Sequence, residues 1–312
     1  MRVQAWNSLC PEEQRRSCSL TMCLRPTVLR VHDFTIRGMD YSLNVEEVYC
    51  AKKTPYQHLL IGKTETFGDA LFLDWQIQSS ETDEHIYHEA LVHPAMAVSL
   101  AAGHPSRVLI LGGGEGATLR EALKHPCIES AVMVDIDRSV VEACRTHLPN
   151  FSAGSFENSR AEIVFQGALE YLVSSKNLFD VIVYDLTDPV PGGPAEGIFT
   201  DNFLVSLASR LTPEGVACFQ MGSAGLHFHS GFRYGLKLLR ERFATVIPYH
   251  TYMASFGLDW GFALATNVHL PVDVGRMVQD NIPSGITSAM SPESLSACFF
   301  LPPILKTSLG VI

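Results

Sequence analysis

The chain has 312 residues, of which 46% are hydrophobic and 18% charged, and its formal net charge is −10. This composition is typical of an ordinary soluble globular protein, and the length predicts a large domain with a smaller one. No apolar run approaches the roughly 18 residues of a membrane span. The chain has 33 acidic and 23 basic residues, which argues against nucleic acid as the main partner. An acidic surface would favour a cationic small substrate, or it would only keep the protein soluble.

Residues 1–41 show no sustained hydrophobic period, and we expect an irregular N-terminal extension there. Three of the eight cysteines lie in it, and none of the eight forms a CxxC pair or has the spacing of metal ligands. We therefore expect no metal site and a cytoplasmic location, where thiols stay reduced.

Residues 42–100 predict a small β domain with a linking helix. Short apolar runs at 59–61, 70–73 and 76–78 are separated by Gly62, Gly68 and Asp74, which indicates a small antiparallel sheet. Residues 84–101 have helical apolar spacing, in which Pro94 could introduce a break.

Residues 101–270 alternate between strand and helix patterns. Strands are expected over 108–111, 131–134, 162–165, 181–184, 216–220, 244–249 and 260–265, with helices over 117–123, 138–147 and 230–242. Such alternation predicts an α/β fold with a doubly wound, Rossmann-like sheet of parallel strands, as in methyltransferases, and ligands at the carboxyl ends of the strands. Residues 271–312 are rich in Pro and Ser and predict an irregular tail.

A glycine-rich turn at 112–116 leaves one predicted strand and opens a helix. Gly112 and Gly114 permit unusual backbone angles and the close approach of a ligand. About twenty residues further on, Asp135 ends the next strand, where a carboxylate can accept hydrogen bonds from both ribose hydroxyls of an adenosine. Turn, spacing and acid together favour a nucleoside site over a purely structural turn.

Glu115 narrows the choice of nucleoside. A carboxylate inside the turn would repel a pyrophosphate, which argues against a dinucleotide. It would also repel the carboxylate of S-adenosylmethionine, whereas the decarboxylated form ends in an ammonium that would pair with it. The alternative is that Glu115 only caps the following helix, and the residue alone does not separate these two interpretations.

Asp185 and Asp188 follow a buried apolar run, at the predicted ligand-binding edge of the sheet. They could simply open a turn, since Asp-Pro is a common turn opener. A chemical role would use both: two carboxylates hold a polycationic amine, and one accepts its proton so that the nitrogen can attack.

Several motifs occur in the order found in one known family. The stretches 109–126, 134–137 and 185–194 resemble the nucleoside loop, the ribose-binding strand end and the catalytic loop of spermidine/spermine synthases, the polyamine aminopropyltransferases. Residues 55–57, 67–68 and 81–89 are similar to the amino-terminal lid domain of that family. The resemblance covers roughly residues 45–270.

This resemblance implies a role for each matching residue. Asp185 would be the proton acceptor, Asp188 a polyamine anchor, and Tyr87 and His88 the lining of the polyamine channel. The donor, decarboxylated S-adenosylmethionine, would be bound as a co-substrate and not as a permanent cofactor; the residues expected around it are Gln57, Gly112, Gly114, Glu115, Asp135, Gln166, Gly167 and Pro194. Gln166 and Gly167 stand where the family usually has an Asp at the adenine, so Gln166 or a backbone carbonyl would serve there. The resemblance also implies a homodimer.

Within the family the thermospermine-synthase branch is the most similar. Its marks here are Glu115, the loop 192–194, and the stretches 220–225 and 254–261, with Ser255 where putrescine-using members usually carry Tyr. This implies transfer of an aminopropyl group to spermidine, giving thermospermine or spermine and methylthioadenosine. Three alternatives stay open: a spermidine synthase acting on putrescine, a methyltransferase using S-adenosylmethionine, and a non-catalytic polyamine-binding protein.

Overall fold

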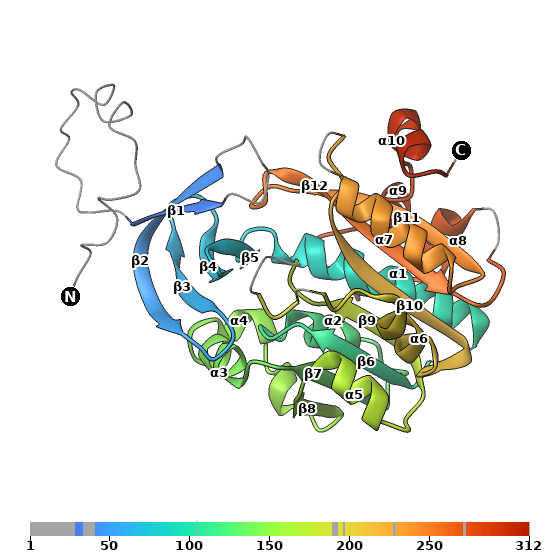
Figure 1. Ribbon diagram of the computed structural model, residues 1–312, viewed down its shortest axis with the longest axis horizontal. Coiled ribbons are helices and arrows are strands. Elements are labelled where there is room, and N and C mark those ends of the chain that lie inside the picture. Colours follow the sequence, from blue (N-terminus) through green and yellow to red (C-terminus); the bar gives the residue numbers. More distant parts are fainter. Residues whose placement is uncertain are drawn as a thin grey trace.

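The computed structural model describes residues 29–33, 41–103, 105–188, 193–195, 197–226, 229–270 and 273–311. Two sheets are connected by the long helix α1 (Glu84–Ala102), which follows the smaller sheet and packs against the larger one (Figure 1). Most of the expected N-terminal extension lies outside the described residues, as does Gly192 of the loop that resembles the thermospermine branch. No helix in the described ranges is both long enough and apolar enough to cross a membrane.

The smaller sheet is antiparallel throughout, as expected, with the order β1-β2-β3-β4-β5. Its strands are β1 (Leu29–Asp33), β2 (Tyr41–Lys53), β3 (His58–Thr64), β4 (Gly68–Leu73) and β5 (Gln76–Ser80). The expectation of irregular structure up to residue 41 was wrong for β1, which pairs with the start of β2 from Leu29↔Val45 to Asp33↔Tyr41. Five residues are too few to show a hydrophobic period, so the strand is evident only from its partner.

Helix α1 continues through Pro94 without a break. Proline lacks the N–H that would bond to the carbonyl of Ala90, four residues earlier. That carbonyl accepts a hydrogen bond of 2.8 Å from the hydroxyl of Tyr249 instead, on β11 (Thr245–Met253). The buried polar group is thereby satisfied by a residue far away in the sequence.

The larger sheet has the order β11-β12-β10-β9-β6-β7-β8. Its other strands are β6 (Arg107–Gly112), β7 (Ser130–Asp135), β8 (Ala161–Phe165), β9 (Phe179–Asp185), β10 (Leu211–Ser223) and β12 (Leu258–Thr266). Strands β6 to β10 pair in parallel as expected, but β12 runs antiparallel to both β10 and β11. Only residues 254–257 separate β11 from β12, and a connection this short permits a hairpin but not a parallel crossover.

Helices cover both faces of this sheet. Alternate residues of β6 point to opposite faces. Val108 and Ile110 pack on the face covered by α1 and α2. Leu109 and Leu111 pack on the face covered by α5, α6 and α7. The helices of this region are α2 (Ala117–Leu123), α3 (Arg138–His147), α4 (Pro149–Ser152), α5 (Ala168–Ser174), α6 (Asp201–Ala208) and α7 (Ser230–Arg240). The small sheet packs its Leu59 and Ile61 against the cluster formed by α2, α3 and α4.

The expectation of an irregular tail after residue 271 was also wrong. The chain forms α8 (Val274–Asn281), α9 (Pro292–Ala297) and α10 (Pro303–Ser308), and α8 packs against α1. Glu89 of α1 accepts hydrogen bonds from the N–H groups of Ser288, Ala289 and Met290, which fixes the segment before α9. Each of these helices is too short to show a helical period. α9 and α10 also begin with Pro, which in the sequence suggests a turn although it is common in the first turn of a helix.

Candidate active site

A pocket lies at the carboxyl ends of β6, β7 and β9 and extends beneath the small sheet and the β11–β12 hairpin. Its lining comes from both sheets, with Leu71 and Gln78 on one side and the glycine-rich turn on the other. Four carboxylates line it, and among the described lining residues there is no Lys, Arg or His; these acids are Glu115, Asp135, Asp185 and Asp188. The pocket is therefore suited to a positively charged ligand.

The glycines of the turn bring it close to two of these acids. Gly112 has a φ of +90°, and a Cβ there would lie 2.1 Å from the backbone oxygen of Asp185. A Cβ at Gly114 would lie 2.9 Å from Oδ2 of Asp135. Any side chain would displace the acids, which is why the sequence has glycine at both positions.

Asp185 ends β9 at the floor of the pocket. Its Oδ1 accepts a hydrogen bond of 2.8 Å from the Tyr87 hydroxyl, and its Oδ2 accepts one from the Thr118 hydroxyl. Burial raises the pKa of Asp185 and the charge of Glu115 raises it further, while His88 and the two hydroxyl donors act in the opposite direction. A carboxylate with a raised pKa that faces a pocket is a suitable acceptor for the proton of an amine.

Asp188 lines the pocket three residues later, and Gln220 of β10 holds it. The Gln220 amide donates to Oδ1 of Asp188 at 3.2 Å and to the backbone oxygen of Leu186 at 2.6 Å, while its own oxygen accepts from the N–H of Gly222. Sequence reasoning gave Gln220 no role, although it stood in one of the stretches that resembled the family. A polar residue within an apolar strand was the available signal.

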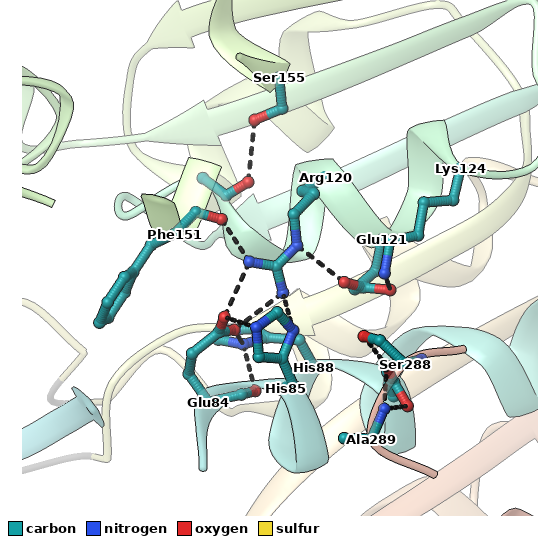
Figure 2. Close-up of polar contacts among 12 residues, drawn as sticks. Glu84, His85, His88, Arg120, Glu121, Lys124, Phe151, Ser155, Ser288 and Ala289 are labelled. Carbon is teal, nitrogen blue, oxygen red and sulfur yellow. Dashed lines mark hydrogen bonds and ion pairs between the residues drawn. The ribbon is translucent and has the colours of Figure 1, made fainter. Parts of the chain in front are cut away.

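Glu115 lies at the pocket wall with His88 directly behind it. The Nε2 atom of His88 is 3.0 Å from Oε1 of Glu115, and its Nδ1 atom is 2.8 Å from Oε2 of Glu84 (Figure 2 shows the surroundings of Glu84 and His88). His88 is fully buried and does not line the pocket, so it does not occupy the channel-lining position expected for it. Neighbouring residues on a helix point in directions about 100° apart, and only Tyr87 of the pair faces the pocket.

Asp135 and Gln57 also line the pocket. Burial raises the pKa of Asp135 to about 7, with the charges of Asp137 and Glu115 contributing, although its bond from the N–H of Asp137 acts against this. The side-chain amide of Gln57 donates a hydrogen bond to Oδ2 of Asp137, and the Thr54 hydroxyl donates to the same oxygen. The other oxygen of Asp137, Oδ1, caps α3 by accepting from the N–H of Ser139. Asp137 thus connects the small sheet to the larger one, a role that sequence reasoning missed.

The structure brings only some of the remaining expected residues to the pocket. Gly167 and Pro194 line the pocket, but Gln166 does not; its backbone N–H, one residue beyond β8, donates to the oxygen of Asp135. Ser255 is fully buried and also lies outside the lining, which is formed instead by its neighbours Phe256, Gly257, Leu258 and Trp260.

The surroundings of Glu115 and Asp185 indicate whether these acids suit a metal ion or an ammonium group. Ligand atoms of His88, Glu115 and Asp185 lie within 4.8 Å of one another, as in a metal site. Both ring nitrogens of His88, however, already face carboxylate oxygens, and a ring protonated at both positions has no lone pair for a metal. The two carboxylates that remain are suited to an ammonium group.

The sequence of residues 84–271 matches the family model described as a spermine/spermidine synthase domain, and residues 31–81 match the one described as a spermidine synthase tetramerisation domain. A polyamine aminopropyltransferase of a Synechococcus species is 46% identical over 237 residues, which span 75% of this chain and 73% of that protein. Polyamine aminopropyltransferase 2 of Pseudomonas aeruginosa is 39% identical over 270 residues, 84% of this chain and 75% of the relative.

The fold is similar to that of solved structures as well. A crystal structure of spermidine synthase in complex with the transition state analogue AdoDATO superposes with a TM-score of 0.83 at 29% identity, covering 91% of this chain and 96% of the other. The matched family model spans more than half of the chain, and the relatives align over most of both sequences. The chain belongs to the spermine/spermidine synthase family.

Proposed function

We propose that this polyamine aminopropyltransferase moves the aminopropyl group of decarboxylated S-adenosylmethionine to spermidine, forming thermospermine or spermine together with methylthioadenosine. The observation that carries the proposal is the charge of the pocket: Glu115, Asp135, Asp185 and Asp188 face it, without a described cationic side chain in its lining. Donor and acceptor are both cations, and intact S-adenosylmethionine would bring a carboxylate next to these acids.

The proposed reaction is a displacement at carbon. A nitrogen of the acceptor attacks the aminopropyl carbon bonded to the sulfonium; the C–N bond forms, the C–S bond breaks, and its electron pair neutralises the sulfur. The acceptor nitrogen must first lose a proton, because an alkylammonium has a pKa of about 10.4. Asp185 accepts this proton and Asp188 holds the amine, while Asp135 with the glycine turn holds the ribose. Positioning for in-line attack supplies most of the acceleration.

The choice of spermidine as acceptor rests on the resemblance to the thermospermine branch. The pocket supports it through its apolar half, where Tyr41, Phe256 and Trp260 offer surfaces for the methylene segments of a long amine. Ser255 does not contribute space directly, because it lies outside the lining.

Product analysis tests the proposal. The purified protein is incubated with decarboxylated S-adenosylmethionine and either spermidine or putrescine, and products are separated by chromatography and identified by mass spectrometry. We expect a tetraamine from spermidine, whose retention time identifies the isomer, and its loss in Asp185→Asn. The matched control is Asp180→Asn at the other end of β9, where the carboxylate accepts from the N–H groups of Ser106 and Arg107 and is remote from the pocket lining.

Other outcomes would change the assignment. Turnover of putrescine alone would overturn spermidine as the acceptor. Methyl transfer from intact S-adenosylmethionine, with no methylthioadenosine from the decarboxylated donor, would overturn aminopropyl transfer itself. Polyamine binding without turnover would make the chain a binding protein.

We also propose that the chain forms at least a homodimer and acts in the cytoplasm. The match of residues 31–81 to a tetramerisation domain supports self-association, and the cysteine spacing supports a reducing compartment. Light scattering on the purified protein would measure the oligomer, and a monomeric mass would contradict the first part.

A further inference from the structure

A chain of alternating charges runs from the pocket wall into the protein. Glu115 contacts His88, His88 contacts Glu84, and Arg120 of α2 binds Glu84 with two bonds of 2.8 Å, one to each carboxylate oxygen. Figure 2 shows Arg120 between Glu84 on α1 and Glu121 on its own helix. Only Glu115 of these residues lines the pocket, so the others act on a ligand through it.

The contacts require His88 to carry a positive charge. Its Nδ1 lies 2.6 Å from the backbone oxygen of Glu84 and 2.8 Å from Oε2 of the same residue, and its Nε2 lies 3.0 Å from Oε1 of Glu115. Carboxylate oxygens only accept hydrogen bonds when ionised, so both ring nitrogens must hold a proton. Burial alone would lower the pKa of His88, but the hydrogen bonds and charges of Glu115 and Glu84 outweigh it and raise the pKa to about 10.

The same charge acts on Asp185. The titratable and charged groups around the cluster are Glu84, His85, Tyr87, Glu115 and Asp185, with Arg120 behind Glu84 and in contact with His85. Glu115 raises the pKa of Asp185 and His88 lowers it. A neutral His88 would leave Glu115 uncompensated, so Asp185 would hold a proton up to a higher pH and would be less available as a base.

We infer that Glu84 is a positioning residue of the reaction: anchored by Arg120, it keeps the His88 ring charged behind Glu115 and thereby keeps Asp185 ionised. The inference rests on the proposed function in giving Asp185 the part of proton acceptor. Glu84 touches neither the pocket nor Asp185; it contacts His85, His88 and Arg120, and it reaches Glu115 through His88.

Two measurements on Glu84→Gln test this. In protein labelled with ¹⁵N-histidine, the His88 resonances, identified by their loss in His88→Gln, should titrate about three or more pH units lower than in the wild type, because one of two ion-pair partners is gone and burial then dominates. A fall of that size makes the ring neutral in the pH range in which the reaction is measured. In kinetics, the acid limb of kcat/KM should move to higher pH. Glu84→Asp keeps the charge and should keep the limb close to its wild-type position.

Glu89→Gln is the matched control. Glu89 is a buried carboxylate on the same helix with several hydrogen bonds, but they go to residues 288–290 and not to His88. The control should lose stability and leave the acid limb where it was. An equal shift of the limb in both variants would overturn the inference, since it would reflect general loosening of α1.

The titration separates this inference from the proposed function because it needs no substrate. A His88 midpoint unchanged by Glu84→Gln overturns the positioning role even if aminopropyl transfer is observed. Absence of turnover in the wild type overturns the proposed function, and the His88 titration then still decides whether Glu84 keeps the ring charged. If Glu84→Gln does not fold, wild-type His88 still decides: a ring that is neutral at pH 8 overturns the inference.

Discussion

The Tyr87 hydroxyl donates a hydrogen bond of 2.8 Å to Oδ1 of Asp185, and so joins α1 to the carboxyl end of β9. This bond favours the ionised form of Asp185, and its removal should raise the pKa of that carboxyl. Because the proposed reaction needs the ionised form, Tyr87→Phe should move the acid limb of kcat/KM to higher pH. One such bond to a charged group is worth about 1.5–3 kcal/mol, so we expect a loss of roughly 10- to 150-fold below the new limb.

Rates measured across the acid limb check this prediction. Tyr234→Phe, on an exposed side chain of α7, serves as the control and should leave the profile unchanged. A uniform loss at every pH, with the limb in place, would mean that Tyr87 orients the substrate without acting on Asp185.

Gln220 should govern the acceptor and not the donor. Its amide holds Asp188 at 3.2 Å and the backbone of the same loop at 2.6 Å. In Gln220→Leu the carboxylate of Asp188 loses its orientation, and we expect the KM for the amine to rise about tenfold, the equivalent of 1.4 kcal/mol. The KM for the nucleoside donor should stay within about twofold. A larger rise for the donor would place Gln220 at the nucleoside end of the pocket.

The sequence predicted those parts of the molecule that local patterns determine. Helices α2 and α3 begin and end at the residues expected from the alternating pattern, and the glycine turn with Asp135 and Asp185 lies at the carboxyl edge of the sheet, as that pattern required. What it missed depends on contacts between distant residues. The sequence cannot show that His88 points away from the pocket, because that depends on where Glu84 and Glu115 meet it in space.

Gly114→Ala should weaken donor binding by steric crowding. The new Cβ would lie 2.9 Å from Oδ2 of Asp135, and overpacking of this kind costs about 1–3 kcal/mol. We expect the donor KM to rise roughly 5- to 150-fold, with little change in the acceptor KM. Gly231→Ala is the control, because a Cβ at that position meets nothing within 4 Å. An unchanged donor KM in Gly114→Ala would argue that Asp135 does not bind the ribose.

The bond from Tyr249 to Ala90 explains why α1 tolerates Pro94, and it yields a prediction about stability. Tyr249→Phe keeps the ring in its stacks with Phe262 and Phe299 and removes only the hydroxyl. The Ala90 carbonyl would then be buried without a partner, which costs about 1–3 kcal/mol. Urea unfolding should show a lower midpoint at an unchanged slope, whereas Tyr252→Phe, on a side chain that is 59% exposed, should not.

The double variant Tyr249→Phe with Pro94→Ala tests whether the unpaired Ala90 carbonyl causes the loss of stability. Alanine at position 94 restores the N–H that a straight helix offers to the Ala90 carbonyl. If the missing partner is the source of the loss, stability should return in the double variant, so that the effects of the two changes are not additive. Additive losses would mean that the Tyr249 hydroxyl acts through Cys218, which lies 3.0 Å from it on the other side, and that Pro94 is accommodated in some other way.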